Sequence, residues 1–293
     1  MEFETRFNTE DACRDYLSKM RWPHGIQCSN CQSNKVWPMS RALYLCKQCR
    51  FQTSVLAGTI FQDSKKPLKL WFRAMWYVTN QKSGVSALGL QRILGFGSYR
   101  TAWKWLHKLR TAMVRPDRDR LSGVVEVDET YIGGPRPGKR GRGAEGKTLV
   151  VIAVEKNGGR IGRIRLKQVS DASSESLNKA VKDAVEPKAR VCTDGWGGYN
   201  SIGPQGYVHR IIRQDSSVGD NLLPGVNRVA SLLKRWLLGT HQGAVETSHL
   251  DYYLDEFTFR FNRRNSRWRG KLFYRLMEQA VQVNPAISQT GGL

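Results

Sequence analysis

The chain has 293 residues, 40% of them hydrophobic, which is enough for two or three domains with a real core and too apolar for a disordered protein. Its 47 lysines and arginines against 25 acids give a net charge of +22, which favours nucleic acid over an acidic membrane surface as the partner. No apolar run approaches the roughly 20 residues that cross a bilayer, and the acidic start is unlike a signal peptide. We therefore expect an intracellular protein with no membrane partner.

Two Cys-x-x-Cys pairs, separated by 14 residues, follow a short helix predicted over residues 1–20. The four cysteines are Cys28, Cys31, Cys46 and Cys49. Each pair places two sulfurs on one tight turn, and two such turns complete a tetrahedral thiolate site. We expect a zinc ribbon over residues 21–58 with a structural zinc ion. The ribbon either binds nucleic acid, with Trp37 and Tyr44 as stacking surfaces, or has a purely structural or protein-binding role.

Residues 59–117 are predicted to form a helical DNA-binding domain. Apolar residues recur there at helical spacing, and a glycine-containing turn at residues 95–97 interrupts the second helical stretch. Two helices joined by such a turn are typical of a helix-turn-helix motif. The second helix, over about residues 98–110, is our candidate for the major groove. Its candidate DNA contacts are Arg100, Lys104 and Lys108.

From residue 118 the pattern changes to a mixture of strands and helices. Three strand-like runs, a helix, two short apolar runs and further helices follow in turn. This is the element order of the RNase H-like fold, so we expect an α/β domain over residues 118–293, with a mixed sheet flanked by helices. Residues 133–147 form a basic, glycine-rich insert, which is either a DNA-contacting loop or a solvated hairpin. Its candidate DNA contacts are Lys139, Arg140 and Arg142.

Two aspartates stand on or just after strand-like runs of this domain. Asp128 lies in the first run, and Asp194 follows the fourth. RNase H-like folds present acidic side chains at one end of the sheet, where two divalent metal ions about 3.5–4 Å apart support phosphodiester chemistry. Mg²⁺ prefers such oxygen ligands. Each aspartate alone is weak support, because the Asp194–Gly195 pair could be a turn and Asp128 an exposed strand residue.

The chain resembles the bacterial insertion-sequence transposases that join an N-terminal zinc ribbon to a DDE-type RNase H-like domain. The similarity covers nearly the whole chain, and it rests on the cysteine ribbon, the basic insert and the runs VDETYIGG, TDGWGGYNSI, SLLKRWLLGTHQG and YLDEFTFRFNRR. It implies that Asp128 and Asp194 are the first two metal ligands. The third ligand of the family, a Glu seven residues before a Lys, falls at Asn227, with Lys234 as the lysine. Some branches of the family carry Asn there.

Asn227 supplies a neutral oxygen that can ligate Mg²⁺ but removes one negative charge from the site. It is either a ligand or only the cap of the helix that begins near it, or both. Lys234 lies two turns further on, near the same helical face, as a phosphate contact or as a solvated lysine. Other acids could replace the missing glutamate. These are Glu126, Glu129, Glu246, Asp251, Asp255 and Glu256.

The resemblance implies a transposase that binds the terminal inverted repeats of its element, cleaves DNA ends and joins the 3′-OH to target DNA. It implies one structural Zn²⁺, two catalytic Mg²⁺ ions, double-stranded DNA as the partner, a homodimer or larger assembly, and a cytoplasmic, nucleoid-associated location. The alternative is a non-catalytic zinc-ribbon DNA-binding protein, such as a decayed transposase, which the missing third acid supports. Further candidate DNA contacts are Lys234, Arg235, Arg260, Arg263 and Arg264. For the last three, salt bridges to Asp255 and Glu256 are the simpler explanation, and His241 remains unassigned.

Overall fold

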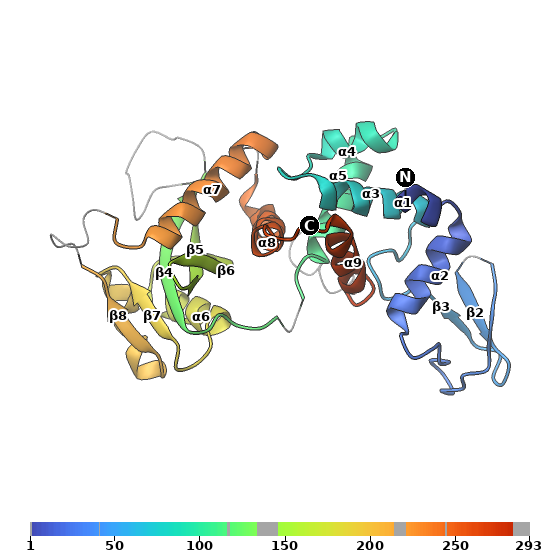
Figure 1. Ribbon diagram of the computed structural model, residues 1–293, viewed down its shortest axis with the longest axis horizontal. Helices are drawn as coiled ribbons and strands as arrows, with labels where there is room; N and C mark the ends of the chain where they lie inside the picture. Colours follow the sequence, from blue (N-terminus) through green and yellow to red (C-terminus); the bar gives the residue numbers. More distant parts are fainter. Residues whose placement is uncertain are drawn as a thin grey trace. The chain divides into compact units, whose positions relative to one another are not determined.

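The chain divides into two compact units, which Figure 1 shows in a computed structural model. Unit 1 comprises residues 1–115 and 266–293, and unit 2 comprises residues 116–265. The structure describes residues 2–40, 42–115, 118–133, 146–213, 221–243 and 245–283. None of the helices in these ranges is long and apolar enough to cross a membrane.

Unit 1 begins with two helices, α1 (Glu2–Arg6) and α2 (Glu10–Arg21), where the sequence predicted a single one. The chain breaks between them because Thr9 is extended and caps α2: its hydroxyl accepts a hydrogen bond from the Ala12 N–H at 3.1 Å. An antiparallel sheet in the order β1-β2-β3 follows. Its strands are β1 (Val36–Pro38), β2 (Leu43–Cys46) and β3 (Gln52–Ser54).

Three helices complete the N-terminal part of unit 1: α3 (Leu68–Asn80), α4 (Ala87–Leu94) and α5 (Tyr99–Thr111). The turn between α4 and α5 lies where the sequence predicted it. Gly95 follows α4 with a φ of 64°, in the left-handed region that glycine adopts without a steric penalty. The helix-turn-helix pattern is therefore present in the structure.

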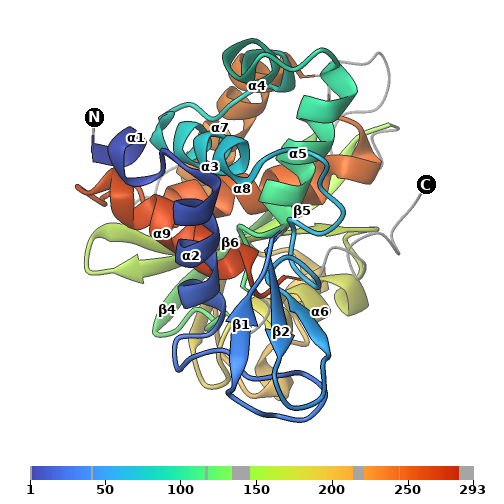
Figure 2. The same ribbon diagram turned by 90° about the vertical axis from the view of Figure 1, so that its right-hand side faces the viewer.

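The last helix, α9 (Arg269–Ala280), also belongs to unit 1, where it packs on α2 and α3 (Figure 2). Phe273 of α9 lies in a cluster of aromatic rings. Its neighbours there are Phe3, Phe7, Tyr16, Phe72 and Trp76. The domain predicted over residues 118–293 thus extended too far, because the aromatic face of α9 is buried against the N-terminal helices.

Unit 2 is built on a five-stranded sheet in the order β6-β5-β4-β7-β8. β5 pairs antiparallel with β4 and β6, while β7 pairs parallel with β4 and β8. This is the mixed, RNase H-like sheet that the element order predicted. The strands are β4 (Val124–Ile132), β5 (Thr148–Asn157), β6 (Arg160–Val169), β7 (Arg190–Thr193) and β8 (Val208–Ile211).

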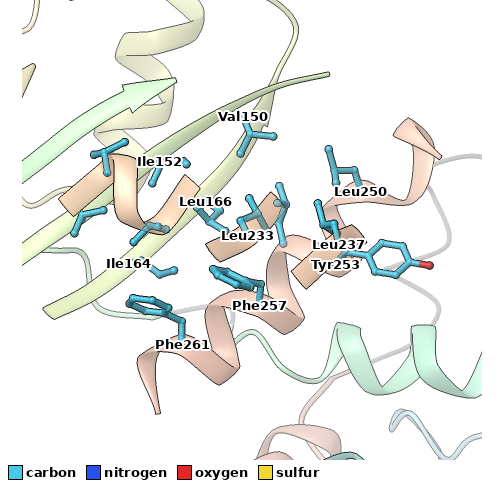
Figure 3. Packing of buried hydrophobic residues seen from close by; sticks show 14 of the residues in the cluster. Val150, Ile152, Ile164, Leu166, Leu233, Leu237, Leu250, Tyr253, Phe257 and Phe261 are labelled. Carbon is cyan, nitrogen blue, oxygen red and sulfur yellow. The ribbon is translucent and has the colours of Figure 1, made fainter. Parts of the chain in front are cut away.

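Helices cover both faces of this sheet. α6 (Ser174–Ala184) packs on one face, and α7 (Pro224–His241) and α8 (Leu250–Asn262) pack on the other. Along β5, Val150 and Ile152 point toward α7 and α8, as Figure 3 shows, whereas Val151 and Ala153 point toward α6. A strand buried on both faces requires a continuous apolar run, which β5 has. Short 3₁₀ turns lie at Gly197–Tyr199, Gly203–Gln205 and Thr247–His249.

Candidate functional site

The four cysteines of unit 1 gather into one cluster whose sulfur atoms all lie within 4.8 Å of one another. The Sγ atoms of Cys28 and Cys49 are 3.5 Å apart, and those of Cys31 and Cys46 are 3.6 Å apart. A tetrahedral zinc ion with bonds of about 2.3 Å would hold sulfurs roughly 3.8 Å apart, so the cluster fits zinc. Within the described residues, no other group of three or more Cys, His, Asp or Glu side chains could hold a metal.

The two Cys-x-x-Cys turns have the same backbone. In each, the N–H of the first cysteine, Cys28 or Cys46, donates to the carbonyl five residues later at 2.9 Å. The residue after each second cysteine is left-handed, with a φ of 58° at Gln32 and 63° at Arg50. Because the turns repeat, each directs its pair of sulfurs in the same way, and together they form a four-sulfur site.

Of the two aromatic residues predicted as stacking surfaces on the ribbon, Trp37 is 55% exposed. The Nζ atom of Lys47 lies 3.9 Å from the centroid of the Trp37 ring, which places a cation beside an accessible aromatic face. Tyr44 is buried, and its hydroxyl donates to Ser18 at 3.2 Å. The prediction is wrong for Tyr44, whose side chain joins the ribbon to α2.

The predicted recognition helix, α5, presents Arg100 and Lys104 to solvent. Lys108 is different, because it is partly buried and its Nζ donates to the carbonyl of Gln62 at 3.1 Å. Burial lowers the pKa of Lys108. The Lys108 amino group, which was predicted to contact DNA, thus makes one hydrogen bond within unit 1.

Asp128 lies on β4, and Asp194 directly follows β7, the neighbouring strand of the unit 2 sheet. Asp128 pairs with Ile152, whose side chain lies in the core beneath α7 and α8. β4 and β7 run parallel, and the last residues that pair are Glu126 and Cys192, each two residues before one of the aspartates. Adjacent strands are about 4.8 Å apart. The two carboxylates, both partly buried, therefore project from neighbouring positions.

Local hydrogen bonds orient both carboxylates. Oδ1 of Asp128 accepts from the Glu129 N–H at 2.8 Å, and Oδ1 of Asp194 accepts from the Trp196 N–H at 3.0 Å. Glu129 itself points to the α6 face, where the Tyr199 hydroxyl donates to its Oε2 at 2.7 Å. Burial and the negative charges of these acids raise the pKa of Tyr199. Glu129 is therefore turned away from Asp128 and does not replace the missing glutamate.

Asn227 lies inside the first turn of α7 and is not its cap. The helix begins at Pro224, with Leu223 as the N-cap residue. The Asn227 N–H donates to the carbonyl of Leu223 at 2.9 Å, and its side-chain Nδ2 donates to Oδ1 of Asn221 at 2.7 Å. The cap alternative is wrong, because the run Pro-Gly starts the helix earlier than the apolar periodicity indicated. Asn227 is exposed, and its Oδ1 is the atom that could bind a metal ion.

Glu126 is hydrogen-bonded and ion-paired to other groups, so it does not take the place of the missing glutamate either. Its Oε2 accepts from the N–H groups of Gly225 and Val226 at 2.7 and 3.1 Å, and its Oε1 lies 2.9 Å from Nζ of Lys156. These contacts bring the start of α7 to β4, two residues before Asp128. The sequence did not predict these contacts, although a helix that starts at Pro-Gly without a Ser, Thr, Asp or Asn cap requires an acceptor from elsewhere.

The remaining acids also lie apart from the aspartate pair. Glu246 and Asp251 are exposed, and Glu256 is buried in an ion pair with Arg260 at 2.8 Å. Burial raises the pKa of Asp255 to about 7. None of these acids completes a cluster of three carboxylates with the two aspartates in the part of the chain that the structure describes.

Arg260 of α8, and Arg263 and Arg264 directly after this helix, make contacts within unit 2. Arg260 pairs with Glu256, as the salt-bridge explanation predicted, while Arg263 donates to the Phe259 carbonyl at 3.3 Å. Arg264 donates to the Gly162 carbonyl at 3.2 Å, on β6, which lies two strands from β4. These residues hold α8 in place and lie apart from the aspartate pair.

On α7, Lys234 and Arg235 are exposed. Although the residue as a whole is exposed, partial desolvation of its amino group and the nearby charge of Lys147 lower the pKa of Lys234. The His241 ring packs against Trp236 and Tyr253, with centroid distances of 4.8 and 4.6 Å, at the end of this helix. The predicted contacts in the basic insert lie outside the described residues. They are Lys139, Arg140 and Arg142.

Residues 120–262 match the family model of the ISXO2-like transposase domain, and residues 8–52 match that of the transposase zinc-ribbon domain. The chain belongs to the insertion-sequence transposases with a zinc ribbon. A protein of the transposable element ISH50 from Halobacterium salinarum is 27% identical to this transposase over 277 residues, which is 87% of this chain and 91% of that protein. The matched transposase domain ends at the last residue of α8, in agreement with the boundary between the units.

Two solved structures are distantly similar to the transposase. The catalytic core domain of BIV integrase is 15% identical with a TM-score of 0.34, and the match covers 50% of this chain and 86% of that one. The Mos1 transposase in a paired-end complex is 11% identical with a TM-score of 0.24, and the match covers 76% and 82%. We therefore assign the fold of the transposase from the strand order of its own sheet, and not from these two matches.

Proposed function

We propose that this transposase cuts DNA at the ends of its element and joins the freed 3′-OH to target DNA, at a site formed by Asp128, Asp194 and Asn227. The observation that supports the proposal is the parallel pairing of β4 with β7, in which Glu126 and Cys192, each two residues before an aspartate, lie opposite each other on the face where α7 begins. Asn227 lies in the first turn of that helix, which Glu126 ties to β4. Two carboxylates and an amide oxygen are the hard donors that Mg²⁺ prefers.

When bound, two Mg²⁺ ions would stabilise the attacking and leaving oxygens of an in-line displacement. Asp128 and Asp194 supply the negative charge that attracts the ions, and Asn227 adds an oxygen without charge. The third position therefore binds a cation more weakly than a glutamate would. Lys234, two turns beyond Asn227 on the exposed side of α7, supplies a cation for a DNA phosphate.

Recognition of the terminal inverted repeats falls to unit 1 in this proposal. The net charge of +22 attracts DNA, α5 presents Arg100 and Lys104, and the zinc ribbon presents Trp37 and Lys47. Phosphate contacts would fix the position of the protein, and a few side chains of α5 would read base edges in the major groove. Two DNA ends must be brought together, so the active form would be a homodimer or a larger assembly.

Strand cleavage of end-bearing DNA with Mg²⁺ tests the catalytic role. Asp128→Asn and Asp194→Asn should each lower the cleavage rate by about 1,000-fold or more, because each removes a charge that stabilises the transition state through the metal. Binding of the DNA ends, measured by gel shift, should be retained. Full cleavage activity in both variants would show that the site lies elsewhere.

The presence of Asn at the third position favours a second candidate, a DNA-binding protein without catalytic activity. Asn227→Ala and Asn227→Glu separate the two functions. A ligand role predicts loss of cleavage with Ala and activity with Glu, with tighter Mn²⁺ binding in the Glu variant. If the wild-type protein binds the DNA ends without cutting them and both Asn227 variants do the same, the result favours a non-catalytic DNA-binding protein.

A further inference from the structure

The first turn of α7 binds a carboxylate from a different element. Leu223, the N-cap residue, has no side-chain acceptor, and Pro224, the first helical residue, has no N–H. The next two residues, Gly225 and Val226, have N–H groups without an acceptor inside the helix. Both donate to Oε2 of Glu126, at 2.7 and 3.1 Å. The Glu126 side chain of β4 thus accepts the hydrogen bonds that an N-cap side chain accepts in most helices.

Gly225 is a second, independent indication that this contact is specific. A Cβ atom at this position would lie 2.6 Å from Oε2 of Glu126, so any other residue would displace the carboxylate. Glu126 is only 7% exposed, and a buried carboxylate is costly unless it is paired and hydrogen-bonded. Lys156 supplies the pair at 2.9 Å, and the positive end of the helix dipole adds to it.

We propose that Glu126 is a positioning residue of the catalytic site, which fixes Asn227 relative to Asp128 by holding the start of α7 on β4. The inference rests on the proposed function, in which Asn227 is a metal ligand. Glu126 precedes Asp128 by two residues on the same face, about 6.6 Å along the strand. Asn227 directly follows the second N–H group that Glu126 binds. The apolar face of α7 sets which side of the helix is buried, and these directional hydrogen bonds set where its first turn lies.

Hydrogen–deuterium exchange of the full-length protein tests the contact without any metal or DNA. Glu126→Ala should make the peptide at the start of α7 exchange about 10-fold faster or more, since its N–H groups lose a charged acceptor. Glu155→Ala is the matched control. Glu155 is also a mostly buried carboxylate of this sheet, bound to Arg163 at 2.7 Å and to the Ser122 N–H at 3.1 Å. This control should leave exchange at the start of α7 unchanged.

Cleavage kinetics test the positioning role. Glu126→Ala should lower kcat by about 100-fold, the effect of a misplacement of about 1 Å, and leave KM for the DNA ends unchanged. The affinity for Mn²⁺, measured by calorimetry, should fall as it does in Asn227→Ala. Glu126→Gln, which keeps an acceptor of the same shape, should rescue part of the rate. In an Asn227→Ala background the Glu126 substitution should not lower the Mn²⁺ affinity further, because both changes act through one ligand.

The outcomes separate this inference from the proposed function. If Asp128→Asn and Asn227→Ala abolish cleavage while Glu126→Ala behaves like Glu155→Ala in exchange and in rate, Glu126 is not a positioning residue and the catalytic site stands. If Asp128→Asn remains fully active, the proposed function fails and the positioning role fails with it. Should Glu126→Ala not fold, Gly225→Ala disturbs the same contact from the helix side. It should reproduce the faster exchange and the loss of kcat, and normal values for both would overturn the inference.

Discussion

The zinc cluster of unit 1 draws its four ligands from residues 28–49, whereas the candidate oxygen ligands of unit 2 span residues 128–227. The cysteines lie on two turns with the same backbone, and the short pairing of β1 with β2, in which Val36 lies opposite Cys46, brings these turns together. In the proposed site, the aspartates and Asn227 would come together only after two strands pair in register and α7 docks on the sheet. The zinc site therefore depends on a short segment of the chain, whereas the candidate magnesium site depends on the fold of the whole domain.

This difference has a consequence for stability. The ribbon sheet is small, and its strands have three or four residues each, so we expect the metal to contribute much of its folding free energy. The sheet of unit 2 is covered on both faces by apolar cores, so it folds independently of any ion. Loss of a zinc ligand should therefore unfold the ribbon, whereas loss of a candidate magnesium ligand should leave unit 2 folded.

The largest effect is expected from loss of a zinc ligand. Cys46→Ala should abolish zinc binding, measured by atomic absorption, and should unfold the ribbon, since structural zinc contributes on the order of 10 kcal/mol to such small domains. Hydrogen exchange over residues 28–54 should become fast, while exchange in β4 and β5 stays slow.

Cys13→Ala is the control for this experiment. Cys13 is also fully buried, but burial raises the pKa of its thiol to about 12, and it lies outside the cluster. The variant should keep its zinc. A ribbon that stays protected in Cys46→Ala would show that its own core folds it, and the contrast between the two regions would disappear.

In unit 2, Asp194→Asn should separate activity from stability. Cleavage should fall by about 1,000-fold or more, but the melting temperature without metal should stay the same or rise, because two adjacent carboxylates repel each other. Asp171→Asn offers a comparison at an exposed site. Hydrogen bonds from Ser173 lower the pKa of Asp171 to about 2, so its loss should reduce stability and leave cleavage unchanged. A large drop in stability with Asp194→Asn would mean that the aspartate has a structural role.

The same difference explains what the sequence could predict. The ribbon followed from spacing, and the order of elements along unit 2 followed from strand-like runs, which the structure shows as strands such as β4 and β6. Asp128 and Asp194 were identified because each stands on or beside such a run. These features depend on neighbours in sequence, so periodicity and spacing report them.

Contacts between distant segments could not be predicted in this way. The carboxylate of Glu126 binds Gly225, 99 residues later, and Asn262 bonds both the N–H and the carbonyl of Ile164 on β6, 98 residues earlier. The aromatic partners of Phe273 in α9 come from the first helices of the chain. Burial of Lys108 likewise depends on a carbonyl 46 residues away. Each pairing requires the three-dimensional fold.

A smaller effect is expected on the stability of the protein in acid. It comes from Glu155, which belongs neither to the zinc cluster nor to the candidate magnesium site. Hydrogen bonds from Arg163 lower the pKa of Glu155 to about 2, below the value of about 4.3 in an unfolded chain. A depressed folded pKa stabilises the protein above pH 4.3, and this stabilisation is lost as the pH falls toward 2. Glu155→Gln should lower the free energy of unfolding at pH 7 by about 2–3 kcal/mol and flatten its loss between about pH 5 and 2. Denaturant titrations at several pH values measure this, and an unchanged slope would contradict the pairing.

The smallest effect is expected at Tyr199, whose buried hydroxyl donates to Glu129 on the α6 face. Tyr199→Phe keeps the ring and removes one hydrogen bond, so it should cost about 1 kcal/mol in urea unfolding. Glu129 adjoins Asp128, and Tyr199 lies in the turn that follows Asp194, so the bond joins the chain segments that carry the two aspartates. We expect a cleavage rate reduced only a few-fold, because the strand register persists without this bond. Tyr207→Phe is the matched control, since its hydroxyl bonds the Val185 carbonyl at 3.3 Å on another part of the domain. An equal loss of rate in both variants would show that general stability, and not this link, sets the activity.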